Sequence, residues 1–307
     1  MKISTTLYFD RATQQLGNVQ GELAKTQEQL STGKQIVKPS DAPDKASLVT
    51  RLESELGRQT SYQETLKSVQ TRLQSEETAL KNTSDVLVRV KELSIQAASD
   101  TLGPADRQSI ALEISSLREQ ILSLANTQDT NGNYLFSGSR VGEPAFGPDA
   151  KGQMVYQGDQ ARMKVAVGDN RRMNMNMPGS DAFVRVIRDD GKGGKVGVGF
   201  FQALDDLAKA VKTSDRTSIQ RGIKEIDTLQ QGASDAVAQI GTDLNVVDMQ
   251  NSVLDEVTLR LKITKSDTED LDYTKAITKM NKDQLALEAA QSSFAKISQL
   301  SLFKYMN

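Results

Sequence analysis

The apolar residues of this chain fall into narrow stripes separated by Gln, Glu, Lys, Thr and Ser. Within a stripe they recur after three or four residues, or after seven, which places them on one face of a helix. Stripes this narrow are typical of the seams along which helices pair in coiled coils. Three of them lie inside the chain: Leu66, Val69, Leu73, Leu80, Leu87 and Val90; Ile110, Ile114, Leu117, Ile121 and Leu124; and Ile240, Leu244, Val247, Leu254 and Leu261.

Two further stripes lie near the ends of the chain. They consist of Leu16, Val19, Leu23 and Leu30, and of Tyr273, Ile277, Met280, Leu287, Phe294 and Ile297. Each can line a helix of about 30 residues, or ~45 Å. An isolated helix with one apolar face is marginal in water. We therefore expect each terminal helix to pair with the other terminus, with another chain, or with both, and to stay largely unpaired in the free monomer.

Glycine marks a middle region of different character. Thirteen of the 21 glycines lie between Asn131 and Phe200, whereas the runs 58–102, 105–131 and 242–307 lack both glycine and proline. Long runs without these breakers favour helices on both sides of an insert. Within the insert, short alternating runs punctuated by turns predict strands at 154–156, 163–167, 172–177 and 182–187.

This organisation predicts a mainly α fold with an inserted β-rich domain. Short helices are expected after Phe200, and the long helical part is expected to resume near Ile240. The expected domains are a terminal helical domain of residues 1–40 and 270–307, a long-helix rod domain of residues 41–130 and 235–269, and an inserted outer domain of residues 131–234, β-rich to about 200.

A helix stop and a rigid loop are predicted after the first stripe. Gly33 is typical of the residue that follows a helix. Pro39 and Pro43 each disfavour helix for the residue before them. Asp41 or Asp44 is expected to cap the helix that follows, because a short acidic side chain accepts hydrogen bonds from free backbone N–H groups.

The composition removes most catalytic and metal-binding chemistry. The 307 residues include 38 Lys+Arg and 40 Asp+Glu, but no His and no Cys. A Ser-His-Asp or Cys-His triad, a zinc site with imidazole or thiolate ligands, and a disulfide are therefore excluded. A net charge of −2 argues against nucleic-acid binding by phosphate neutralisation. Neither a transmembrane helix nor a secretory signal peptide is expected.

Three glycine-containing segments resemble ligand-binding loops but depart from the required patterns. Segment 31–35 lacks the first glycine of a phosphate loop, because Glu28 stands there. Segment 191–199 does not have the spacing of a dinucleotide loop and is interpreted as a flexible hairpin or linker. Segment 129–133 starts like a calcium loop, but Tyr134 takes the place of the required glycine, so a turn is expected.

The remaining candidates are a methionine stripe and two acidic pairs. Three thioethers at positions 173, 175 and 177 could share a strand face and bind Cu(I), although such a stripe is more often a buried face. Glu76–Glu77 and Asp205–Asp206 are interpreted as solvated helix faces, because adjacent helical residues point in different directions. No catalytic, cofactor-binding or metal site and no enzymatic activity are expected, although a glycosidase could work with carboxylates alone.

Segments at both ends and at the borders of the insert resemble the flagellin superfamily. The loop LSTGKQIVKPSDAPDKAS (30–47) resembles the loop after the first helix in that superfamily, and residues 285–305 closely resemble its C-terminus. NGNYLFSGS (131–139), YQGD (156–159) and NMPGSDAF (176–183) are similar to segments of flagellar hook–filament junction proteins. These matches include both ends of the chain, so the resemblance spans it.

The resemblance implies an elongated helical-bundle rod with paired N- and C-terminal helices. It also implies export through the flagellar type III apparatus to the extracellular hook–filament junction, with self-association in a ring. The implied partners are hook-associated protein type 1, flagellin and a flagellar export chaperone, without nucleic acid or membrane insertion. The assembly surface is expected to include Leu16, Val19, Leu23, Leu30, Ile277, Met280, Leu287, Phe294, Ile297, Leu302 and Phe303. The alternatives are a flagellin proper and, from the heptads alone, a cytoplasmic coiled-coil scaffold.

Overall fold

The computed structural model describes residues 2–189 and 194–303, with side chains described for Leu7 and for residues 9–189 and 194–296. The chain forms two compact units, the first of Met1–Gln59 with Glu256–Asn307 and the second of Thr60–Asp255.

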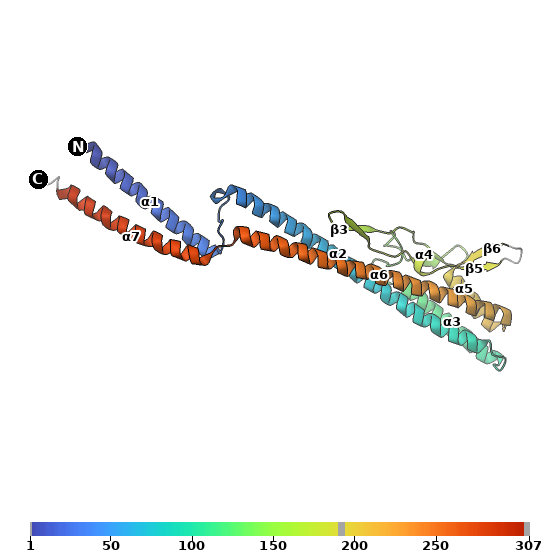
Figure 1. The fold of residues 1–307 in the computed structure, drawn as a ribbon. Helices are drawn as coiled ribbons and strands as arrows, with labels where there is room; N and C mark the ends of the chain where they lie inside the picture. Colours follow the sequence, from blue (N-terminus) through green and yellow to red (C-terminus); the bar gives the residue numbers. More distant parts are fainter. Residues whose placement is uncertain (1, 190–193, 304–307) are drawn as a thin grey trace. The chain divides into compact units, whose positions relative to one another are not determined.

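Helices account for most of the chain (Figure 1). In chain order these are α1 (Lys2–Thr32), the 3₁₀ turn η1 (Pro39–Asp41), α2 (Pro43–Ala97), α3 (Pro104–Ala125), the one-turn α4 (Gly179–Ala182), α5 (Phe200–Lys212), α6 (Arg216–Glu269) and α7 (Tyr273–Phe303). Six short strands lie between α3 and α5. The predicted mainly α fold with a β-rich insert is confirmed, and both terminal helices have the predicted length of about 30 residues.

The three interior stripes, apart from Leu261 in the first unit, contribute to the core of the second unit. On α2, Leu66, Val69, Leu80, Leu87 and Val90 are completely buried. The stripes on α3 and α6 bury their central residues in the same cluster and leave Leu117, Leu124, Leu244 and Leu261 half-buried. Because apolar burial supplies most of the folding free energy, these seams hold the long helices together.

The strands form three separate antiparallel hairpins. β1 (Phe146–Pro148) pairs with β2 (Met154–Tyr156), β3 (Lys164–Gly168) with β4 (Arg171–Asn174), and β5 (Val186–Asp189) with β6 (Lys195–Val198). A two-stranded hairpin is marginal by itself. Its support here includes an aromatic cluster: Phe146 meets Phe201 with ring centroids 5.0 Å apart, and Phe183 meets Phe200 at 5.2 Å.

Two of the predicted strands end or begin elsewhere. The strand expected over 182–187 begins only at Val186, because Ala182 closes α4 and Phe183 turns into the aromatic cluster. β4 stops at Asn174, so Met177 lies beyond the strand. Met173 and Met177 are buried and Met175 packs against the same core, in agreement with the buried-face interpretation.

Strands β1 and β6 were not predicted. β1 is only three residues long and contains glycine and proline, so it shows no alternation. β6 lies in the glycine-rich segment interpreted as a hairpin or linker. Both strands are recognised only by their antiparallel partners, since pairing and packing decide short strands more than intrinsic preference does.

The helix expected to resume near Ile240 begins at Arg216, so α5 is the only separate helix between the last strand and α6 in the described chain. The glycines within α6 allow close packing and do not break the helix. A Cβ on Gly222 would lie 2.6 Å from Leu207 Cδ1, and one on Gly232 would lie 2.5 Å from Val184 Cγ2. The missing Cβ atoms give room for neighbouring side chains.

We predict opposite effects for two glycine substitutions in α6. Gly232→Ala gains about 1 kcal/mol of helix propensity but forces Val184 out of its place, so a net loss of about 1–2 kcal/mol in stability is expected. Gly241→Ala meets nothing within 4 Å and should stabilise the chain by about 0.5–1 kcal/mol. Urea unfolding followed by circular dichroism measures both. Equal changes in stability for the two variants would contradict the packing of Val184 against Gly232.

Candidate assembly interface

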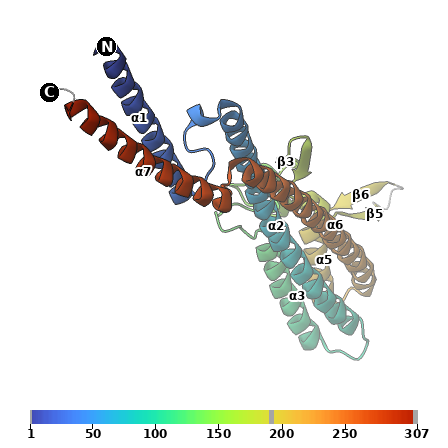
Figure 2. The same cartoon turned by 60° about the vertical axis from the view of Figure 1, so that its left-hand side comes forward.

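In the first unit, α1 and α7 lie side by side and antiparallel (Figures 1 and 2). The residues of α7 that are not exposed, among those with described side chains, are Ala276, Met280, Asp283, Leu287, Ala290 and Phe294. The facing residues of α1 are Phe9, Ala12, Leu16, Val19, Leu23, Thr26 and Leu30. Both sets alternate steps of three and four residues, so the two helices form one coiled-coil seam. We call these thirteen residues the terminal seam.

Contacts along the terminal seam fix its register. Near its open end the rings of Phe9 and Phe294 meet edge to face, with centroids 5.6 Å apart. Further along, the Lys279 ammonium lies 2.6 Å from the Glu22 carboxylate and donates to the Thr26 hydroxyl at 3.3 Å. The hydrogen bond from Lys279 lowers the pKa of Glu22, and the same bond raises the pKa of Lys279. Because this ion pair is exposed, it aligns the helices more than it stabilises them.

The terminal seam is covered from one side only. Thr26 and Ala276 are its only buried members, and the other eleven are half-buried. A helix pair leaves much of each apolar residue in contact with water, because a third or fourth helix is needed to enclose it. The structure thus differs from the expectation of largely unpaired stripes, since their matching heptads allow each terminus to half-cover the other.

Three large apolar side chains of α7 lie outside the terminal seam and are exposed. Tyr273, Ile277 and Leu285 are 53%, 46% and 66% exposed. Their spacing in multiples of four places them on one i±4 row, the kind of ridge that packs into the groove of another helix. We call these three residues the outer row. Leu285 was missed by sequence reading because it falls outside the heptad stripe.

The predicted interface residues divide between these features. Leu16, Val19, Leu23, Leu30, Met280, Leu287 and Phe294 belong to the terminal seam, and Ile277 belongs to the outer row. The side chains of Ile297, Leu302 and Phe303 lie outside the described residues, although α7 extends to Phe303. The assembly role of all eleven residues stays a prediction.

The terminal pair is tied to the start of α2 and the end of α6 at one point. Gly33 ends α1 with a φ of +69°, a left-handed conformation that favours glycine, which confirms the predicted helix stop. Its carbonyl accepts from the Leu271 N–H at 3.0 Å, and the Gln35 N–H donates to the Glu269 carbonyl at 2.7 Å. A Cβ at position 33 would lie 2.8 Å from the Tyr273 hydroxyl, so a larger residue there would also displace this exposed side chain.

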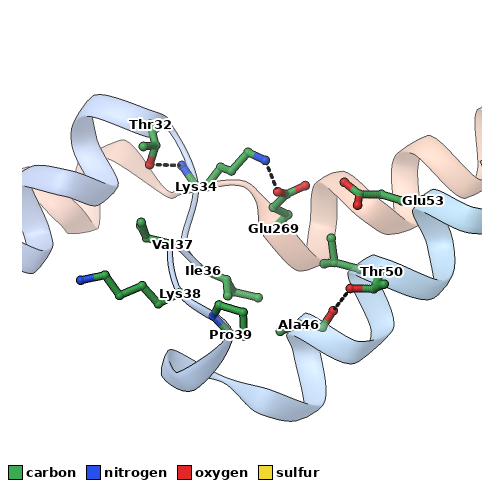
Figure 3. A pocket seen from close by; sticks show the side chains of 11 residues that line it. Thr32, Lys34, Ile36, Val37, Lys38, Pro39, Ala46, Thr50, Glu53 and Glu269 are labelled. Carbon is green, nitrogen blue, oxygen red and sulfur yellow. Dashed lines mark hydrogen bonds and ion pairs between the residues drawn. The ribbon is translucent and has the colours of Figure 1, made fainter.

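The loop after Gly33 borders an open groove of about 590 Å³ (Figure 3). Its apolar lining is Ile36, Val37, Pro39, Ala46 and Val49. Lys34 extends from the loop to pair with Glu269, and Glu53 of α2 pairs with Lys265 at 2.7 Å. These ion pairs brace the connection between the helices.

Of the two residues predicted to cap the second helix, Asp41 instead caps the 3₁₀ turn η1 that precedes it. Asp41 accepts from the Lys38 N–H at 3.1 Å and so closes η1. The hydrogen bond from Lys25 holds the pKa of Asp41 below its usual range. Because α2 begins at Pro43, Asp44 already lies within its first turn.

The acidic pairs separate as expected, but one interpretation was wrong. Asp205 turns to Arg118 and Asp206 to Arg188. Glu77 pairs with Lys81 at 2.7 Å, whereas Glu76 is completely buried rather than solvated. A sequence signal existed, because position 76 continues the alternation 66, 69, 73 and 80 of the α2 stripe.

The described chain offers neither a metal-binding cluster nor a membrane-spanning helix. No group of three or more carboxylate side chains there is arranged to hold a metal ion. None of the described helices combines the length and apolar character needed to cross a bilayer.

Known proteins resemble this chain both in sequence and in fold. Residues 3–140 match the bacterial flagellin N-terminal helical region. Flagellar hook-associated protein 3 of Escherichia coli (strain K12) is 28% identical, and that of Salmonella typhimurium (strain LT2) is 26% identical, each over 99% of both chains. The chain is thus similar to bacterial flagellins over its N-terminal helical region. It is a homologue of flagellar hook-associated protein 3 and a structural component of the flagellum.

A solved structure shares the fold. Xanthomonas campestris FlgL superposes with a TM-score of 0.62 at 22% identity, covering 71% of this chain and 99% of that one. This chain therefore shares the fold of that structure over the matched 71% of its length.

We predict that the terminal seam stabilises the single chain and that the outer row does not. Leu287→Ser should weaken the α1–α7 pair by about 1–2 kcal/mol, because it removes apolar burial from the seam and places a hydroxyl there. Leu285→Ser should leave the pair unchanged, because the side chain is already exposed. Amide exchange in α1 and α7 of the monomer measures both. If amide exchange became faster only in the Leu285 variant, Leu285 and not Leu287 would stabilise the helix pair.

Proposed function

We propose that this chain is the adaptor that joins the hook-side junction protein to the flagellin filament. The observation that carries the proposal is the half-covered terminal seam beside the exposed outer row of α7. A pair of helices in this state has apolar surface left for neighbouring subunits. The homology to flagellar hook-associated protein 3 supports this place in the flagellum.

Assembly and ordering of the terminal helices are coupled in this proposal. Fixing a residue costs about 1–2 kcal/mol of backbone entropy, which a two-helix seam offsets only in part. Completing the burial of a Leu, Ile or Phe side chain contributes up to about 1.5–3 kcal/mol. Neighbouring copies in a ring would supply this burial, so the terminal helices become fully stable only within the assembly.

The two units take different roles. The terminal helical domain, residues 1–40 and 270–307, contacts hook-associated protein type 1 on one side and the first flagellin subunits on the other. The insert of residues 131–234 lies outside this contact zone. The role is structural and requires no catalytic chemistry.

Export precedes assembly. The chain leaves the cell through the flagellar type III apparatus, and an export chaperone covers α7 until then. The support is the amphipathic character of α7, whose outer row would promote aggregation if it stayed uncovered.

Complementation of a strain that lacks this chain tests the proposal. The deletion should give hooks without filaments and shed flagellin into the medium. The double variant Ile277→Ser/Leu285→Ser should be exported normally but fail to restore filaments, because the outer row can no longer pack on a neighbour. Removal of all residues after Asp283 should also abolish incorporation while the second unit stays folded.

The matched control is Leu112→Ser on α3, which removes a leucine that is 67% exposed in the second unit. It should restore filaments like the natural chain. Normal filaments with the double variant would refute the role of the outer row. If the chain itself dominated isolated filaments by mass, it would be a filament subunit and not an adaptor.

A further inference from the structure

We propose that Arg72 and Glu76 form a pH-sensitive lock that holds the inserted region on α2. This inference goes beyond the proposed function, because it concerns the second unit and uses none of the terminal residues. It rests on a buried cluster whose members come from α2, from the loop after α3 and from the segment after β4.

The two side chains of the lock hold separate segments of the insert. Arg72 Nη2 donates to the carbonyls of Tyr134 at 3.2 Å and Leu135 at 2.8 Å. Glu76 Oε2 accepts from the Met177 N–H at 3.2 Å. Arg72 is 5% exposed and Glu76 is 0% exposed. One turn of α2 therefore fixes the two ends of the β1–β4 region through hydrogen bonds that water does not reach.

Two carboxyl groups share the single guanidinium of the lock. Arg72 Nε lies 3.3 Å from Glu76 Oε1, and Arg72 Nη1 lies 3.5 Å from Asp129 Oδ2. Neither Arg72 Nε nor Glu76 Oε1 makes a well-aligned hydrogen bond. Asp129, by contrast, accepts from the N–H groups of Asn131 at 2.8 Å and Asn133 at 2.9 Å.

These surroundings place the proton on Glu76 and the charge on Asp129. Burial raises the pKa of Glu76 to about 8, although Arg72 opposes this shift. Burial also acts on Asp129, but hydrogen bonds from Asn133 and Asn131 bring the pKa of Asp129 below its usual value. From α6, Asp243 adds negative charge that further disfavours ionised Glu76, while Arg162 faces Asp243.

The direction of the pH effect follows from these protonation states. In the unfolded chain Glu76 titrates near 4.5, whereas in the folded chain its pKa is about 8. Between these values the folded state binds one more proton than the unfolded state. The stabilisation is therefore complete below the unfolded pKa and is lost as the pH rises through the folded pKa, with up to about a tenfold change in the unfolding constant per pH unit.

The test uses the full chain at pH values from 5 to 9. Urea unfolding and amide exchange of the segment 171–178 are measured for the natural chain and for Glu76→Gln. A glutamine has one acceptor and a donor group, like a protonated carboxyl, so it keeps the Met177 contact without titrating. We expect exchange of this segment to speed up with pH in the natural chain, after correction for the intrinsic rate, and to lose this dependence in the variant.

A control isolates Glu76 as the source. Glu64→Gln on the exposed side of α2 should keep the pH dependence. If Glu76→Gln fails to fold or is at least tenfold less stable at pH 7, Glu76 is ionised and the lock is a permanent ion pair. A pH dependence that survives in Glu76→Gln would equally overturn the proposal.

Discussion

The structure depends on apolar seams between long helices. The number of elements that cover a seam decides whether it becomes a closed core or keeps an exposed apolar surface. In the second unit the α2 stripe is enclosed, and its leucines and valines are completely buried. In the first unit the same kind of seam has one partner helix and stays half-exposed. The same kind of sequence pattern thus gives an enclosed core in the second unit and a half-exposed seam in the first. Hydrophobic burial explains both, since its gain grows with the area removed from water.

Much of this fold could be predicted from the sequence because helical periodicity is a local property. The stripes located every long helix, and Gly33 marked the end of the first. The start of α6 could not be predicted, because Gly222 and Gly232 signal a break locally but serve tertiary packing. The strands β1 and β6 were missed for a similar reason, since only their partners define them.

The candidate interface was predicted in part. Most of the predicted stripe residues of α1 and α7 lie in the terminal seam, whereas Tyr273 and Ile277 lie outside it, and their role in assembly stays a prediction. The sequence did not reveal that the two sets of heptads match each other. Leu285 escaped notice because exposure of an apolar residue is visible only in three dimensions. Glu76 was misread since a charged residue on a helix is usually solvated. Its place in the seam alternation now accounts for its burial.

The separate hairpins of the insert have a consequence for engineering. Each hairpin is paired internally and packs on the helices through a few side chains, and among the described residues the three hairpins form separate sheets. A loop such as the one around Lys151, between β1 and β2, can accept an inserted epitope without shifting the register of the other two. The insert is in this sense modular, and foreign peptides could be displayed there while the long helices keep their alignment.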